Sequence, residues 1–179
     1  IEVITNKIMS VDGQEKRVVQ LSWMLGLKEN NYPIKEIEAK LAVPTIDGKR
    51  AEVSRVVDFN TMTYYDYSYD GSNVTFKFTN EAKNNEIRWK LEGNEKVILT
   101  FIYDKEVNVD TQKFTAEQKV KLYDDKEFTA SQEITLNNEE KDNIVTISSY
   151  PEENNIYKGR LYAGLEQEYV TNTSVNINF

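Results

Sequence analysis

The chain has 179 residues, of which 39% are hydrophobic, 11% aromatic and 29% charged, and its formal net charge is −8. This length suits one medium domain or two small ones, and the aromatic and β-branched content excludes a disordered chain. The acidic balance disfavours nucleic acid and anionic membrane surfaces as partners. The absence of Cys and His excludes disulfides, thiolate metal sites and Ser-His-Asp or Cys-His catalysis.

Alternation of apolar and polar residues with a period of two runs through the chain and predicts strands that each place one face on a core. In chain order, the predicted strands lie near residues 21–27, 37–43, 53–59, 74–78, 87–91, 97–103, 120–122, 134–136, 145–147, 161–163 and 175–179. Residues 115–121 fit either one helical turn or a strand. Short strands at this spacing, with turns between them, are typical of an antiparallel β-sandwich.

Three Asp-Gly dipeptides predict tight turns, because both residues tolerate positive φ: Asp12-Gly13, Asp47-Gly48 and Asp70-Gly71. A domain boundary is predicted near Asp104–Asp110, where a hydrophobic strand gives way to a polar stretch. Residues 1–104 and 105–179 would then be two sandwiches in tandem, the second smaller; one continuous sandwich is the alternative.

The stretch Tyr64–Tyr69 contains four tyrosines and leads into the turn at Asp70-Gly71. A turn closed on Asp70–Asn73 sets up three facing pairs on the core side of a hairpin: Tyr69 with Val74, Tyr67 with Phe76, and Tyr65 with Phe78. The alternative is an exposed patch that binds a sugar or a protein, because Tyr offers rigid apolar area with a polar tip. Tyr64, on the polar face, and Tyr69, at the turn, are the candidate ligand-binding residues. Trp23, Tyr150 and Tyr157 are further candidates for such a patch.

Acidic pairs such as Glu36 and Glu38 are frequent, but neighbouring acids on a strand or in a polar loop are expected to be solvated rather than to converge in a cleft. The stretches Asp70–Asn73, Asn137–Asn143 and Pro151–Asn155 gather oxygen ligands without the spacing of an EF-hand loop. They predict hydrated turns rather than calcium sites. We therefore expect no enzyme activity, no cofactor and no metal.

The stretches Val18–Pro44 and Asn73–Asp104 each have a strand, a polar or Gly-centred link and a second strand. Together they resemble the Ig-like repeat domains of Gram-positive bacterial surface proteins. This resemblance implies Ig-like β-sandwich modules outside the cell, in the stalk of an adhesin. The Cys-free composition rich in Lys, Asn and Glu fits an AT-rich Firmicute.

Many domains of this kind carry an intramolecular Lys–Asn isopeptide bond, and the resemblance makes Lys7, with Asn172 or Asn176, the candidate pair. The chain begins at Ile1 without Met, no signal peptide is visible, and no apolar run reaches transmembrane length, so we expect a piece of a longer protein. The similarity of Glu2–Ile8 to Glu168–Val175 predicts a repeat array, with chance as the alternative.

The function predicted from these observations is a non-catalytic stalk or scaffold module of a surface adhesin, in contact with neighbouring repeats. The alternative is a module that binds a host extracellular-matrix protein or glycan through exposed tyrosines.

Overall fold

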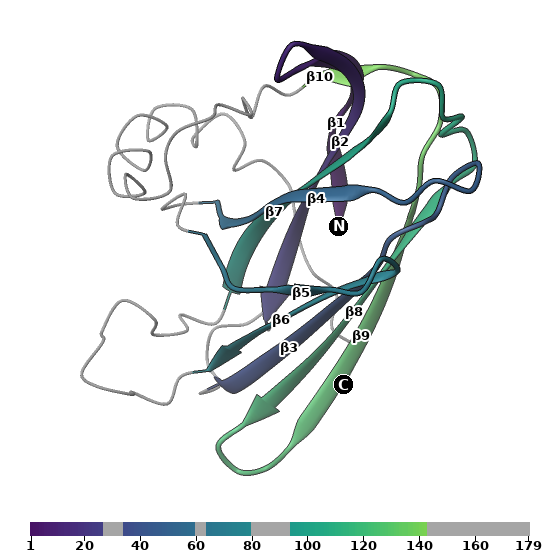
Figure 1. Ribbon diagram of the computed structural model, residues 1–179. Coiled ribbons are helices and arrows are strands. Elements are labelled where there is room, and N and C mark those ends of the chain that lie inside the picture. The colour runs from purple at the N-terminus through teal and green to yellow at the C-terminus, as the bar shows by residue number, and fades with distance from the viewer. Residues whose placement is uncertain (27–33, 60–63, 80–93, 143–179) are drawn as a thin grey trace.

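The computed structural model describes residues 1–26, 34–59, 64–79 and 94–142, which contain strands and no helix (Figure 1). The strands are β1 (Glu2–Val11), β2 (Gln14–Gly26), β3 (Ile34–Ala42), β4 (Glu52–Asp58), β5 (Ser68–Tyr69), β6 (Asn73–Thr79), β7 (Asn94–Asp104), β8 (Lys113–Leu122), β9 (Glu127–Thr135) and β10 (Lys141–Asp142). A search of these residues for a helix that could span a membrane finds none.

The strands form two antiparallel sheets that pack face to face (Figure 1). Sheet A has the order β10-β1-β2-β7-β4, and sheet B has the order β5-β6-β3-β8-β9. This arrangement confirms the predicted all-β sandwich. Residues 115–121 belong to the strand β8 rather than to a helical turn. The predicted strands near 87–91, 145–147, 161–163 and 175–179 and the repeat similarity at 168–175 lie outside the described residues.

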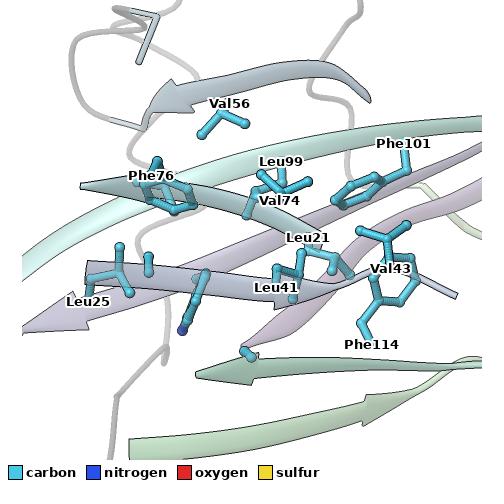
Figure 2. Close-up of a cluster of buried hydrophobic side chains, with 14 of the residues drawn as sticks. Leu21, Leu25, Leu41, Val43, Val56, Val74, Phe76, Leu99, Phe101 and Phe114 are labelled. Atoms are coloured by element: carbon cyan, nitrogen blue, oxygen red, sulfur yellow. The ribbon is translucent and has the colours of Figure 1, made fainter. Parts of the chain in front are cut away.

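The hydrophobic core lies between the two sheets, because every second side chain of each strand points inward. Figure 2 shows side chains of the two sheets packed against each other. Sheet B contributes Leu41, Val74 and Phe114, and sheet A contributes Leu21, Leu25, Leu99 and Phe101. Trp23 of β2 lies edge-on against Phe76 of β6, with ring centroids 6.0 Å apart. Burying each such side chain contributes about 1.5–3 kcal/mol, so the alternation in the sequence largely dictates which faces meet.

Two Asp-Gly turns adopt the predicted conformation. Asp12 and Gly13 have φ of 49° and 79°, and Asp47 and Gly48 have φ of 52° and 74°. Two consecutive residues with positive φ make the turn whose twist matches that of the flanking strands. The first turn joins β1 to β2, and the second closes the small hairpin in which Ile46 pairs with Lys49.

The predicted boundary near Asp104–Asp110 lies between β7 and β8, and in the described residues the strands on both sides of it belong to the same two sheets. β8 follows the boundary and pairs with β3, which precedes it, from Ala42 opposite Thr115 to Ile34 opposite Leu122. The intervening stretch is polar in composition, yet Val107 and Val109 are buried in the same core. Alternation reveals which face of a strand is apolar but not which strand it pairs with, so the sequence could not exclude two modules.

The outer faces of the two sheets differ sharply. On sheet B the outward side chains of β3, β6 and β8 are exposed: Glu38, Lys40, Thr75, Lys77, Glu117 and Lys119. On sheet A the outward side chains of β2, β4 and β7 are buried: Val18, Gln20, Ser22, Arg55, Val57, Lys96, Ile98, Thr100 and Ile102. Sheet A is therefore buried on both sides, and sheet B on one.

Candidate functional site

The tyrosine segment closes one open side of the sandwich, where β5 at the edge of sheet B lies beside β4 at the edge of sheet A. Three alternate tyrosines donate their hydroxyl hydrogens across this gap. Tyr65 donates to Oδ2 of Asp58 at 2.6 Å, Tyr67 to the carbonyl of Val53 at 3.2 Å, and Tyr69 to the carbonyl of Ala51 at 2.8 Å. Because the three tyrosines alternate along the chain, their hydroxyls point the same way, and their hydrogen bonds connect the two sheets at this edge.

The predicted register of the hairpin is confirmed at its turn, where Tyr69 pairs with Val74 and Ser68 with Thr75. Asp70 stabilises this turn by accepting hydrogen bonds from the backbone N–H groups of Ser72 and Asn73 at 2.8 and 2.6 Å. These two donors lower the pKa of the Asp70 carboxyl. Its Oδ1 oxygen is therefore an acceptor that holds the turn.

Tyr65 packs as the sequence predicts. Its ring lies edge-on against Phe78, with centroids 4.7 Å apart. Burial, together with the neighbouring Asp58 carboxylate, raises the pKa of the Tyr65 phenol well above its ordinary value. The hydroxyl consequently stays protonated and remains a donor to Asp58 across the physiological pH range.

The two tyrosines predicted as ligand-binding residues, Tyr64 and Tyr69, are half-buried and make contacts within the fold. Tyr64 forms an isolated bridge with Val57, and its ring lies below the Arg55 guanidinium, 5.9 Å from ring centroid to Cζ. Tyr69 packs against the hydrophobic core, and burial raises its pKa. Both tyrosines therefore make contacts at the edge between the two sheets.

A shallow groove of about 580 Å³ lies on the outer face of sheet B. Its floor is the surface of β3, β6 and β8, and residues 66–68, leading into β5, form one wall. The lining side chains that carry charge are Glu38, Lys40, Asp66, Lys77, Glu117 and Lys119. Three are acidic and three basic, so the groove is neutral on a chain whose net charge is −8.

The charges in the groove alternate across neighbouring strands. Glu38 of β3 lies opposite Lys77 of β6 and opposite Lys119 of β8, while Lys40 lies opposite Glu117. Lys77 also forms an ion pair with Glu36 at 2.6 Å. Opposite charges placed across strands stabilise a sheet modestly, by about 0.2–1 kcal/mol per pair. They also present donors and acceptors at regular spacing, which suits a ligand with repeated polar groups.

Tyr67 is the exposed tyrosine at this groove, with 38% of its surface accessible, whereas the sequence predicted it on the core side of the hairpin. Alternation placed it opposite Phe76 in a hairpin, but the paired part of β5 is only Ser68–Tyr69. Where the ladder ends, the Tyr67 ring lies along the groove wall while its hydroxyl reaches Val53. The length of a short edge strand is not encoded in a period-two pattern, so no signal in the sequence pointed to this residue.

Lys7, the predicted isopeptide lysine, lies on β1 and forms an ion pair with Asp142 of the adjacent strand β10. Asn172 and Asn176, its predicted partners, lie outside the described residues. The structure therefore supplies an acidic neighbour for Lys7 and leaves the cross-link as a prediction.

Other candidates from the sequence are placed as follows. Trp23 is fully buried in the core, which corrects its assignment to an exposed patch. Tyr150 and Tyr157 lie outside the described residues. Within residues 1–26, 34–59, 64–79 and 94–142, no cluster of three or more Asp, Glu, His or Cys side chains is arranged to hold a metal ion. The carbonyl of Asn137, in the loop after β9, accepts a hydrogen bond from the side chain of Asn6 at 2.9 Å.

Comparisons with known proteins give neighbours in structure only. No protein-family model matches the chain, and no curated protein matches it. The full-length major pilin SpaD of Corynebacterium diphtheriae aligns with 19% identity and a TM-score of 0.43, over 74% of this chain and 32% of that one. This chain therefore spans about a third of the pilin.

Two further solved structures are similar at the same level. Domains D2 and D3 of SpaD align with 16% identity and a TM-score of 0.40, over 74% of this chain and 49% of that one. The collagen-binding subdomain of the Enterococcus faecalis surface protein ACE aligns with 9% identity and a TM-score of 0.38, over 66% and 88%. Likeness of this degree assigns the chain neither a family nor a ligand.

Proposed function

We propose that the chain is a non-catalytic structural module of an extracellular surface protein. The observation that carries this proposal is the long ladder at the centre of sheet A. β2 pairs with β1 from Gln14 to Ser22 and with β7 from Lys16 to Gly26. Strands of this length share many hydrogen bonds perpendicular to their axis. Sliding them apart requires these bonds to break together, which suits a module that transmits tension.

A row of buried side-chain hydrogen bonds reinforces the same ladder. The Thr5 hydroxyl donates to Oε1 of Gln20 at 2.7 Å, and Nε2 of Gln20 donates to Oγ1 of Thr100 at 3.0 Å. All three side chains are buried, so water does not compete for these bonds. The row joins β1, β2 and β7 at one level of the sheet and adds to their resistance against sliding.

Pulling single molecules of the full chain from its two ends tests the structural proposal. We expect one cooperative unfolding event at a well-defined force, and a lower force for Gln20→Ala, which removes the buried row. Lys119→Ala, on the exposed face of sheet B, is the matched control and should unfold at the parent force. Gradual extension without a force peak would contradict the proposal.

A second candidate function, binding of an extended polypeptide or a glycan, is supported by the neutral groove on sheet B and by the exposed Tyr67 at its wall. Alternating charges match the repeated donors and acceptors of such ligands, and the Tyr67 ring offers rigid apolar area. The host extracellular-matrix proteins and glycans predicted from the sequence belong to this class.

The binding proposal is tested with the immobilised chain and a panel of glycans and matrix proteins that includes collagen, the ligand named for the ACE subdomain. We expect a saturable signal that Tyr67→Ala weakens by roughly tenfold or more, the range of an interface hot spot. Tyr123→Ala is the matched control, because Tyr123 is 50% exposed and does not line the groove. Absence of binding by the folded chain, or equal loss in both variants, would remove this candidate.

The isopeptide bond between Lys7 and Asn172 or Asn176 is a further proposal. Its formation would join the lysine nitrogen to the asparagine side-chain carbonyl carbon and release one ammonia. Intact-mass measurement of the parent chain should therefore show the loss of one ammonia, and Lys7→Arg should restore the full mass. A parent chain at full mass would refute the cross-link without bearing on the structural module.

A further inference from the structure

The outer face of sheet A is buried although it faces away from the core. Ile98 and Ile102 of β7, Val18 of β2 and Val57 of β4 point outward here, and none is part of the cluster between the sheets. Ile98 is 1% exposed, and Thr100, the polar residue beside it, is fully buried. Side chains on an uncovered sheet face stand perpendicular to it and remain open to water. A further layer therefore lies on this face.

Sheet B provides the internal control for this conclusion. Its central strand β3 is flanked by β6 and β8, as β2 is flanked by β1 and β7 in sheet A. Outward residues in the same central position, such as Lys40 and Thr75, are exposed. A place in the middle of a five-stranded sheet is thus insufficient to bury an outward side chain in this molecule.

The described strands do not supply this layer. All of them belong to one of the two sheets, and sheet B packs against the inner face of sheet A. The exposed fractions refer to the single chain, so the covering layer must come from the part of the chain outside the two sheets. Residues 143–179 form the longest remaining stretch, and they follow β10 directly.

β10 fixes where this stretch begins. Thr5 and Asn6 of β1 pair with Asp142 and Lys141, so the chain leaves β10 at the edge of sheet A itself. A dozen extended residues span roughly 40 Å, whereas a five-stranded sheet is roughly 20–25 Å wide, so residues 143–179 are long enough to cross it more than once. They also hold three alternating apolar pairs: Val145 and Ile147, Leu161 and Ala163, and Val175 and Ile177.

We propose that residues 143–179 dock on the outer face of sheet A and form the layer that buries it. The face suits a largely apolar cover, because Val18, Val57, Ile98 and Ile102 line it and three of its polar side chains, Thr5, Gln20 and Thr100, are joined by hydrogen bonds. Ser22, Arg55 and Lys96 are also buried on this face. An alternating segment laid on this face buries its apolar residues against Val18, Ile98 and Ile102. The module then consists of three layers, and its C-terminal segment is part of the fold rather than a linker.

The absence of cysteine allows a direct test in the full chain, because one introduced thiol is unique. Ile98→Cys reports on the outer face of sheet A, and Lys119→Cys on the exposed face of sheet B. Leu99→Cys, which points into the core, reports on global opening. With a soluble disulfide reagent under native conditions, we expect the Ile98→Cys thiol to react at least ~100-fold more slowly than the Lys119→Cys thiol.

The covering segment is then identified by charge substitutions in the Ile98→Cys background. Each apolar pair of residues 143–179 is replaced by two aspartates in a separate variant, and the same changes are made in the Leu99→Cys background. We expect at least one variant to raise the reactivity of Ile98→Cys at least tenfold while Leu99→Cys stays protected, because a charge buried on the face displaces the layer.

Four results would overturn the proposal. They are rapid reaction of Ile98→Cys in the parent background, unchanged protection in all three aspartate variants, simultaneous exposure of the Leu99→Cys thiol in every variant that responds, and protection that falls on dilution. The last result would assign the layer to a second copy of the chain.

Discussion

The two outer faces of the sandwich are made by strands of similar length, and they lie in opposite environments. On sheet B the outward residues are charged or hydroxylated, and they line an open groove. On sheet A they are mainly Val, Ile, Thr, Gln and Ser, together with Arg55 and Lys96, and they are buried. In this molecule, the type of side chain that points outward from a sheet therefore indicates whether a further layer covers that sheet. Alternating charges dominate the open face, whereas apolar residues and a hydrogen-bonded polar row dominate the buried face.

The largest effect on stability is expected from truncating a buried outward side chain of sheet A. Ile98→Ala should lower the free energy of unfolding by about 3 kcal/mol, because it leaves a cavity beneath the covering layer. Urea denaturation followed by circular dichroism measures the change.

Thr75→Ala is the matched control for that experiment, since Thr75 points outward from sheet B and is exposed. It should change stability by no more than about 0.5 kcal/mol. Equal effects at the two positions would show that the faces do not differ energetically.

The second largest loss of stability is expected from disrupting the buried row Thr5–Gln20–Thr100. Thr100→Val keeps the shape of the side chain but removes the acceptor for Nε2 of Gln20, leaving a buried donor unpaired at a cost of about 2 kcal/mol. Thr115→Val on the exposed face of sheet B is the corresponding control, and its hydroxyl is open to water. If both valine variants prove neutral in urea melts, the row is not a stabilising feature of sheet A.

The edge between the two sheets should give a smaller effect. Tyr65→Phe removes the hydrogen bond to Asp58 and should cost about 1 kcal/mol. Tyr67→Phe should cost less, because Tyr67 is exposed and its bond to Val53 is longer. Thermal unfolding of the two variants separates them, and a larger loss for Tyr67→Phe would reverse the proposed order.

The smallest effect concerns exposed charge. Lys49 and Lys16 hold the pKa of the Asp104 carboxyl below its ordinary value of 3.8. A lowered pKa in the folded state means that the carboxylate stabilises the protein above pH 3.8, and that this contribution disappears as the pH falls through the folded pKa. Asp104→Asn should therefore flatten the acid limb of the stability curve. The Thr5–Gln20–Thr100 row has no titrating group, so Thr100→Val should leave that limb unchanged in shape.

Local patterns were sufficient to predict much of the fold. The alternation around Leu21, Leu41 and Leu99 indicated the inward faces, because a residue spacing of two maps directly onto one side of a strand. The Asp-Gly dipeptides indicated turns, because few other pairs accept positive φ twice in succession. The pairing of Tyr69 with Val74 followed from the turn predicted at Asp70–Asn73.

The candidate site was less accessible to such reasoning. The groove depends on β3, β6 and β8 lying side by side, and strands distant in sequence become neighbours only through long-range pairing. Tyr67 is exposed because β5 stops after two paired residues, and Tyr69 is half-buried because its hydroxyl reaches across to the carbonyl of Ala51.

The sequence by itself determined that this chain forms antiparallel strands with defined inward faces and tight Asp-Gly turns, since these depend on neighbouring residues alone. Only the tertiary structure decided that residues before and after position 104 share one sandwich, that the tyrosines bridge its two sheets, and that one outer face is covered while the other is open. These features depend on contacts between residues far apart in the chain, which the period of a sequence does not encode.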